Sequence, residues 1–146
     1  MVKYFRRSIQ ALTEVFNFLE TFIRKHQVNT DVSFAVQLAV EEIFTNLVKY
    51  HSNNPNRIRI ELFYEPETVT VSISDFDVEE FDITEHTATF AGLPLEKRKP
   101  GGLGLYLVQK IMDQVEYVYD PQKRECEITL VKYLGETDVR SRQRRQ

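Results

Sequence analysis

The sequence predicts one α+β domain, a two-layer sandwich with helices on one face of a mostly antiparallel sheet. Two stretches in the N-terminal third repeat apolar residues at helical spacing, and later stretches alternate apolar and polar residues as strands do. The length of 146 residues suits a single domain. We place that domain at residues 1–134 and expect residues 135–146, which carry four arginines, to form a flexible basic tail.

Apolar periodicity predicts the first two helices. Ser8 suits the N-cap of a helix over about residues 9–26, and Thr30 or Asp31 suits the N-cap of a second helix over about residues 31–50. In both segments the apolar residues recur in steps of three and four, which places them on one face of a helix. Each helix is therefore expected to cover a sheet with that face.

The strands follow from alternation. Arg57 to Tyr64 and Val69 to Ser74 alternate apolar with polar residues across a short Glu-Pro-Glu turn, which predicts an antiparallel hairpin with one buried face. The C-terminal part predicts strands over residues 117–119 and 125–133, which would close the sheet.

A third helix is expected over residues 105–115, just before these closing strands. Residues 76–100, which precede it, show no clean period, begin acidic and end basic. A connection of that length is more often a functional lid than a passive link.

Composition narrows the function classes. The 19 Lys and Arg residues stand against 22 Asp and Glu residues, for a net charge of −3, which argues against a nucleic-acid binder that neutralises phosphates. Cys126 is alone and lies in a predicted strand, so we expect a packing role and a reducing, cytoplasmic setting. No apolar run is long enough for a membrane span, and the N-terminus does not resemble a signal peptide. His26 and His86 are expected on the surface.

Glycine is concentrated at one place. Gly101, Gly102 and Gly104 are three of the five glycines in the chain, and they come just before the third helix. Glycines let backbone N–H groups approach a ligand closely, and a helix N-terminus adds partial positive charge, so the segment suits phosphate. The alternative is a tight loop that enters a packed helix.

Two polar residues share a face of the second helix. Glu42 and Asn46 are four residues apart, beside the apolar stripe. The Asn46 carbonyl oxygen could bind Mg²⁺, and Glu42 could accept a proton from a water or hydroxyl nucleophile. The alternative is an exposed polar pair on an amphipathic helix.

Asp75 ends the second strand of the predicted hairpin. A carboxylate at this point could accept a hydrogen bond from the exocyclic amino group of adenine, whereas guanine has a carbonyl there. The alternative is an ordinary turn aspartate.

Taken in order, these segments resemble the Bergerat-type ATP-binding fold of the GHKL superfamily and, within it, the small anti-sigma-factor serine kinases. Glu42-Ile43-Phe44-Thr45-Asn46 resembles the N box, Ser74-Asp75 the start of the second box, and residues 101–108 (Gly-Gly-Leu-Gly-Leu-Tyr-Leu-Val) the glycine box. The resemblance covers about residues 5–134, and the glycine box is its most specific part.

The resemblance implies a role for each residue, with ATP and Mg²⁺ as cofactors. Glu42 would be the general base that activates a serine hydroxyl, Asn46 would hold Mg²⁺ against the phosphates, and Asp75 would read adenine. The phosphate lid would comprise Gly101, Gly102, Leu103, Gly104 and Leu105, with Arg98 or Lys99 near the phosphates. Family members act as homodimers that sequester a sigma factor and phosphorylate an antagonist protein, and neither nucleic acid nor membrane is an expected partner.

Two positions depart from the family pattern. The second box normally reads Asp-x-Gly, whereas Asp77 stands at the glycine position, and Tyr50 replaces a frequent histidine while His51 comes one residue later. The leading hypothesis is an ATP-dependent serine/threonine protein kinase. The alternative is a binding module of the same fold with weak or no nucleotide binding. A third hypothesis, the catalytic half of a sensor histidine kinase, would need a separate phosphoacceptor protein.

Overall fold

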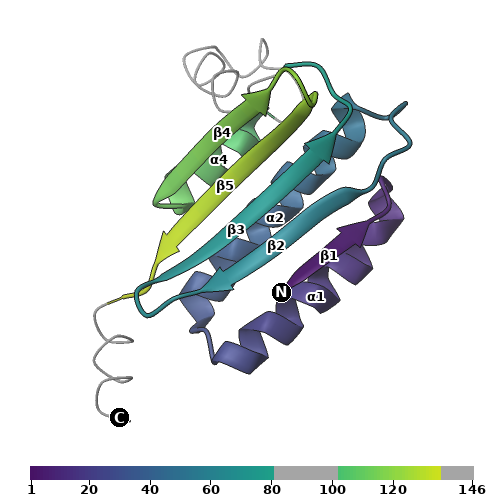
Figure 1. The fold of residues 1–146 in the computed structure, drawn as a ribbon. Helices are drawn as coiled ribbons and strands as arrows, with labels where there is room; N and C mark the ends of the chain where they lie inside the picture. The colour runs from purple at the N-terminus through teal and green to yellow at the C-terminus, as the bar shows by residue number, and fades with distance from the viewer. Residues whose placement is uncertain (81–101, 136–146) are drawn as a thin grey trace.

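A computed structural model describes residues 1–80 and 102–135 of the chain. These residues form two layers, with three α-helices on one face of a five-stranded sheet (Figure 1). The predicted fold class is confirmed. The elements in chain order are β1 (Val2–Phe5), the short 3-10 helix η1 (Ile9–Ala11), α1 (Leu12–His26), α2 (Thr30–Tyr50), β2 (Ile58–Tyr64), β3 (Thr68–Phe76), α4 (Gly102–Ile111), β4 (Gln114–Asp120) and β5 (Glu125–Tyr133).

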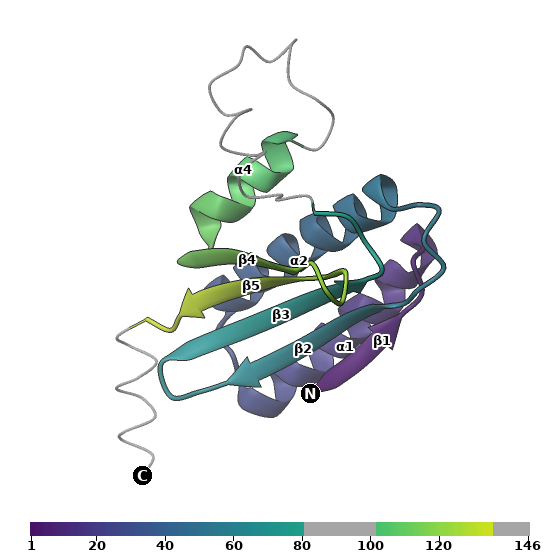
Figure 2. The same ribbon diagram turned by 45° about the horizontal axis from the view of Figure 1, so that its top comes forward.

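The sheet is antiparallel throughout, in the order β1-β2-β3-β5-β4. The predicted hairpin forms from β2 and β3, and the two predicted closing strands pair with each other as β4 and β5. Strand β3 lies at the centre, so Asp75 near its C-terminal end is flanked by β2 on one side and by Cys126 of β5 on the other. The turned view shows the opposite face of the sheet open, without a covering helix in the described part of the chain (Figure 2).

The core lies between the sheet and the helices because each strand turns alternate apolar residues toward them. Phe5, at the end of the edge strand β1, makes edge-on ring contacts with Phe18 of α1 and Phe44 of α2. These contacts bind the N-terminal strand to both long helices. The largest fully buried side chains are Phe5, Leu19, Phe22, Ile43, Phe44, Leu47, Ile58, Ile60, Leu62, Ile73 and Ile128.

The junction between α1 and α2 corrects one prediction. Gln27, with φ of 52°, ends α1 in the left-handed region, and the chain is extended at Asn29. The Asn29 side chain accepts a hydrogen bond from Val32 N at 2.8 Å, so Asn29 is the N-cap. The prediction of Thr30 or Asp31 was wrong, because the turn at Gln27 brings the chain into the helix one residue earlier. Ser8, predicted as the N-cap of a helix over residues 9–26, caps the short helix η1, whereas α1 begins at Leu12 with Ala11 at its N-cap.

The third helix is shifted from its predicted range of 105–115. It runs from Gly102 to Ile111, and Val115 belongs to β4. The backbone N–H of Asp113 already donates to the Val131 carbonyl at 2.9 Å. Pairing with β5 therefore ends the helix although the apolar pattern would allow it to continue.

Several further predictions concern single residues. Cys126 is buried in β5, as predicted. His26 is half-buried rather than on the surface, and its ring stacks on Tyr64 with 4.4 Å between centroids. His86, most of the expected lid at 76–100 and nearly all of the C-terminal tail lie outside the described residues. Within the described residues, no helix has the length and apolar character needed to cross a membrane.

Candidate functional site

Helix α2 carries the first two candidate residues one turn apart. Asn46 is 2% exposed, and its side-chain amide donates to the Glu42 carbonyl at 2.6 Å. Its Oδ1 atom is buried and has no hydrogen-bond partner among the described residues. A buried carbonyl oxygen without a donor is unfavourable unless a ligand or a water molecule satisfies it. Asn46 is thus not part of an exposed polar pair, which was the alternative for this position.

Glu42 lies on the same face but is only half-buried. Burial raises the pKa of its carboxyl above 4.5, the neighbouring Glu41 raises it further, and Lys49 partly opposes the shift. A carboxylate with a raised pKa is a better proton acceptor than an ordinary glutamate near neutral pH. These properties suit a general base.

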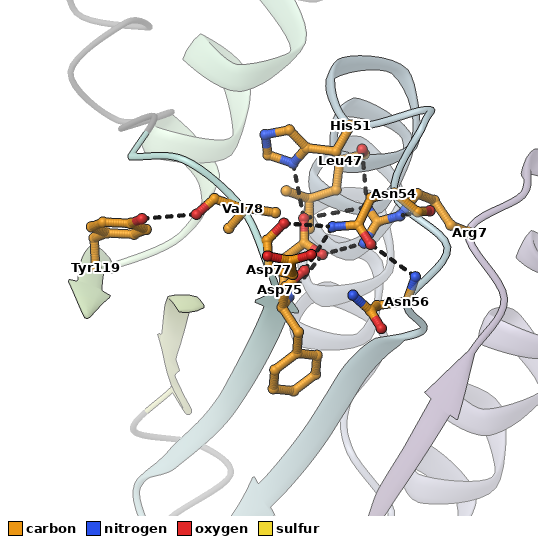
Figure 3. Close-up of polar contacts among 10 residues, drawn as sticks. Arg7, Leu47, His51, Asn54, Asn56, Asp75, Asp77, Val78 and Tyr119 are labelled. Carbon is orange, nitrogen blue, oxygen red and sulfur yellow. Dashed lines mark hydrogen bonds and ion pairs between the residues drawn. The ribbon is translucent and has the colours of Figure 1, made fainter. Parts of the chain in front are cut away.

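Asp75 lies inside β3 and is fully buried. Both of its oxygens are held by protein groups (Figure 3). Arg7 binds them in a two-pronged ion pair, with Nη1 3.2 Å from Oδ2 and Nη2 on Oδ1, while Nδ1 of His51 lies 2.9 Å from Oδ2 and Phe76 N donates to Oδ1 at 3.1 Å. Asp75 is therefore the centre of a buried network, and the alternative of an ordinary turn aspartate does not hold.

Arg7 connects this network to the rest of the fold. Its side chain is 3% exposed and also donates to two backbone carbonyls, Asn54 at 3.1 Å and Leu47 at 3.3 Å. One guanidinium thus links the segment after β1, the last turn of α2, the following loop and β3. Leu47 is the residue next to Asn46, so the hydrogen bond from Arg7 to the Leu47 carbonyl places the network next to Glu42 and Asn46 on α2.

The network determines the ionisation of Asp75. Burial alone would raise the pKa of this carboxyl, but the hydrogen bonds from His51 and Arg7, together with the positive charge of Arg7, lower it below 3.8. The carboxylate is therefore charged at neutral pH.

A cavity of about 680 Å³ opens beside the network, at the C-terminal end of α2. Its lining includes His51 but not Glu42, Asn46 or Asp75. The lining residues are Tyr50, His51, Ser52, Asn53, Asn54, Pro55, Asp77, Val78, Glu79, Glu80 and Arg124. Three carboxylates and one guanidinium give the cavity an acidic character.

Asp77, at the glycine position of the family pattern, adopts the conformation that favours glycine, with φ of 55°. The Asn54 side chain holds the backbone here by donating to the Phe76 and Asp77 carbonyls at 2.6 and 3.2 Å. The exposed Asp77 carboxylate lies 3.6 Å from Arg124. The turn therefore forms without a glycine, and an exposed ion pair partly balances the added charge.

The remaining candidates belong to the glycine-rich segment. Arg98, Lys99 and Gly101 lie outside the described residues. The backbone of residues 102–105 (Gly102, Leu103, Gly104 and Leu105) forms the first turn of α4, which packs beside α2. The first N–H groups of such a turn can bind phosphate oxygens. No cluster of three or more His, Cys, Asp or Glu side chains suited to a metal occurs in the ranges 1–80 and 102–135.

Sequence reasoning missed Arg7 and Asn54, and it noted His51 only as a displaced histidine without giving it a role. Arg7 belongs to no motif, and its contact with Asp75 joins residues 68 positions apart.

Residues 5–132 match the histidine kinase-like ATPase domain family. The chain belongs to this family. Its curated relatives include the serine-protein kinase RsbW of Listeria monocytogenes serotype 4a, 28% identical over 110 residues, which are 71% of this chain and 68% of the relative. The protein of the same name from Oceanobacillus iheyensis is 30% identical over 111 residues, covering 71% and 67% of the two chains.

A solved structure supports the fold. A chain in the crystal structure of the SiaB–SiaC complex from Pseudomonas aeruginosa superposes with a TM-score of 0.60 at 15% identity, covering 92% of this chain and 89% of that one. Together with the family match and the kinase relatives, it confirms the resemblance to the GHKL superfamily and its anti-sigma-factor kinases.

Proposed function

We propose that the chain is an ATP- and Mg²⁺-dependent protein serine/threonine kinase of the anti-sigma-factor type. The observation that carries this proposal is the buried Oδ1 of Asn46, which has no donor among the described residues and lies one turn from Glu42, whose pKa is raised. The kinase names of the curated relatives support the same reaction class.

The residues on α2 suit the metal. Mg²⁺ takes oxygen ligands and usually combines one or two from protein with water and phosphate oxygens, so a single amide oxygen at Asn46 fits it. When bound, the ion would offset charge on the ATP phosphates. The Asn46 side chain is held in one orientation because its amide nitrogen donates to the Glu42 carbonyl. In this orientation Oδ1 is on the opposite side of the amide group from that hydrogen bond.

Glu42 would accept the proton of a serine or threonine hydroxyl on the protein substrate. The hydroxyl oxygen then bonds to the γ-phosphorus while the bond from that phosphorus to the bridging oxygen breaks, and ADP leaves. Asp75 would define the adenine end of the site. Gly101 to Leu105 would bind the phosphates from the other side, with Arg98 or Lys99 nearby.

The test is transfer of labelled phosphate from ATP to an antagonist protein. We expect Glu42→Gln to lower the transfer rate by about 10²- to 10⁴-fold, the usual contribution of a general base. Glu41→Gln is the matched control, because it removes a neighbouring carboxylate of the same helix and should retain most of the activity. Equal rates for wild type and Glu42→Gln would remove Glu42 from the mechanism.

The partners belong to the proposal as well. The phosphorylated protein would be an antagonist, and a sigma factor or similar regulator would be sequestered, in the cytoplasm and by a homodimer. Strand β1 is an edge of the sheet with Val2 and Tyr4 exposed, which supports self-association. Light scattering should give twice the monomer mass, and a monomer at all concentrations would contradict the dimer.

One observation favours a second candidate, a non-catalytic binding module. Arg7 and His51 hold the Asp75 oxygens that an adenine amino group would need. Calorimetric titration with ATP and Mg²⁺ separates the two candidates. Heat that saturates with nucleotide supports the kinase, and its absence at high micromolar protein supports the module.

A further inference from the structure

The Asp75 carboxylate does not line the cavity. Its side chain is fully buried, and it is absent from the residues that line the cavity. Arg7 covers both oxygens, His51 shares Oδ2, and the Phe76 amide shares Oδ1. A base in the cavity would have to displace part of this network to reach the carboxylate.

His51 lies between Asp75 and the cavity. Its side chain is 19% exposed and lines the cavity, while Nδ1 lies 2.9 Å from Oδ2 of Asp75. Figure 3 shows the ring turned so that its second nitrogen points away from Asp75. A charged carboxylate only accepts hydrogen bonds, so Nδ1 carries the hydrogen, and in the neutral ring Nε2 is left as an acceptor.

We infer that His51, oriented by Asp75, is the residue that selects adenine, because its Nε2 can accept a hydrogen bond from the amino group of the base. This role depends on the proposed nucleotide binding and changes the residue that contacts the base. Asp75 then acts as a positioning residue that fixes the ring and its tautomer, as a carboxylate does for a metal-bound histidine.

The charge of the cavity favours the base over the phosphates as its occupant. Asp77, Glu79 and Glu80 contribute carboxylates to the lining, with Arg124 as its guanidinium. Such a lining favours a neutral base that carries an amino donor and disfavours a triphosphate. The base would therefore occupy the cavity, while the phosphates would lie toward Asn46 and the start of α4.

Inosine and adenine nucleotides test whether His51 Nε2 accepts a hydrogen bond from the base. Adenine has an amino group at C6, whereas the inosine base has a carbonyl at C6 and a hydrogen at N1. A C6 carbonyl would place an acceptor against Nε2, so we expect wild type to bind ADP about tenfold more tightly than IDP, both with Mg²⁺, in calorimetric titration. His51→Asn retains a donor near the position of Nδ1 but has no group at the position of Nε2. Its preference for ADP should fall to about twofold or less, through weaker ADP binding.

Two further variants complete the experiment. His51→Gln places an amide oxygen near the position of Nε2 and should recover part of the preference. Thr21→Ala changes an exposed residue of α1 that does not line the cavity, and it should leave the preference intact. Thermal unfolding of His51→Asn checks that the fold survives.

The outcomes separate the inference from the proposed function. The inference is overturned if His51→Asn keeps the wild-type preference, or if it binds ADP more tightly, as expected for a ring that merely blocks Asp75. Equal binding of ADP and IDP by wild type also overturns it, while leaving nucleotide binding intact. Binding of neither nucleotide would overturn the proposed function together with it.

Discussion

Arg7 and Asp75 form a buried ion pair, and its energetics differ from those of a surface pair. Removing two charges from water is costly, and the attraction offsets the cost only with good geometry and further hydrogen bonds. Here the guanidinium binds both carboxylate oxygens and two backbone carbonyls, at Leu47 and Asn54. Removing Arg7 would leave the buried Asp75 carboxylate without its ion-pair partner, held only by His51 and the Phe76 amide.

Arg7→Met should therefore lower the free energy of unfolding by about 3–5 kcal/mol, measured by urea denaturation at pH 7. Arg6→Met is the matched control, because the Arg6 side chain is 65% exposed and lies 3.9 Å from Glu14. A surface pair of this kind contributes at most about 1 kcal/mol. Equal losses in the two variants would contradict the importance of the buried pair. The double variant Arg7→Met/Asp75→Leu should recover much of the loss, since no charge remains buried.

The lowered pKa of Asp75 gives stability a defined pH dependence. A carboxyl with a lower pKa in the folded state binds fewer protons there than in the unfolded state. Its contribution is fully present above its ordinary value of 3.8 and is lost as the pH falls from there through the folded-state pKa. We expect wild type to lose its advantage over Asp75→Asn below about pH 4. Urea midpoints from pH 7 to 3 check this, and parallel curves would contradict it.

At the scale of elements, the start of α2 depends on one cap. Asn29 Oδ1 accepts from Val32 N, one of the helix N–H groups that has no partner within the helix. Asn29→Ala should lower the free energy of unfolding by about 1 kcal/mol. Thr30→Ala is the control and should cost less, because Thr30 is already the first helical residue and is exposed. The reverse order in thermal or urea unfolding would show that the cap lies elsewhere.

Elements with strong periodicity could be predicted from the sequence, whereas their ends depended on contacts. The helices on either side of Gln27 and both hairpins follow from patterns that local sequence carries. The end of α4 does not, because the hydrogen bond from Asp113 to Val131 belongs to the sheet. The apolar pattern up to Val115 contains no information about that pairing.

The same distinction applies to the candidate site. Glu42 and Asn46 could be paired from sequence because four residues make one helical turn. Asp75 could be placed at a strand end, but its partners could not be named. Arg7 and His51 reach it from positions 68 and 24 residues away. Only the folded arrangement brings them together, with β1 paired to β2 beside β3 and α2 packed on β3.

For the whole molecule, this convergence couples the site to global stability. The network joins the segment after β1, the C-terminal turn of α2, the loop after it and the central strand, and α4 packs against α2. A ligand held between these segments would bind the folded state and not the unfolded chain. Binding should therefore raise the free energy of unfolding by mass action.

ATP with Mg²⁺ at about a hundredfold excess over its dissociation constant should add about 2.7 kcal/mol to the free energy of unfolding. For a chain of this size, that corresponds to a rise of about 8 °C in the melting temperature. Glu42→Gln should keep the full rise, since a general base does not bind the nucleotide. Asn46→Ala should lose the part of the rise that depends on Mg²⁺, because the substitution removes Oδ1, the proposed ligand of the ion. Scanning calorimetry with ATP, with and without Mg²⁺, measures both effects. If no nucleotide raises the melting temperature of wild type, the binding module remains as the function. The reason is that a nucleotide that binds only the folded state must raise the free energy of unfolding.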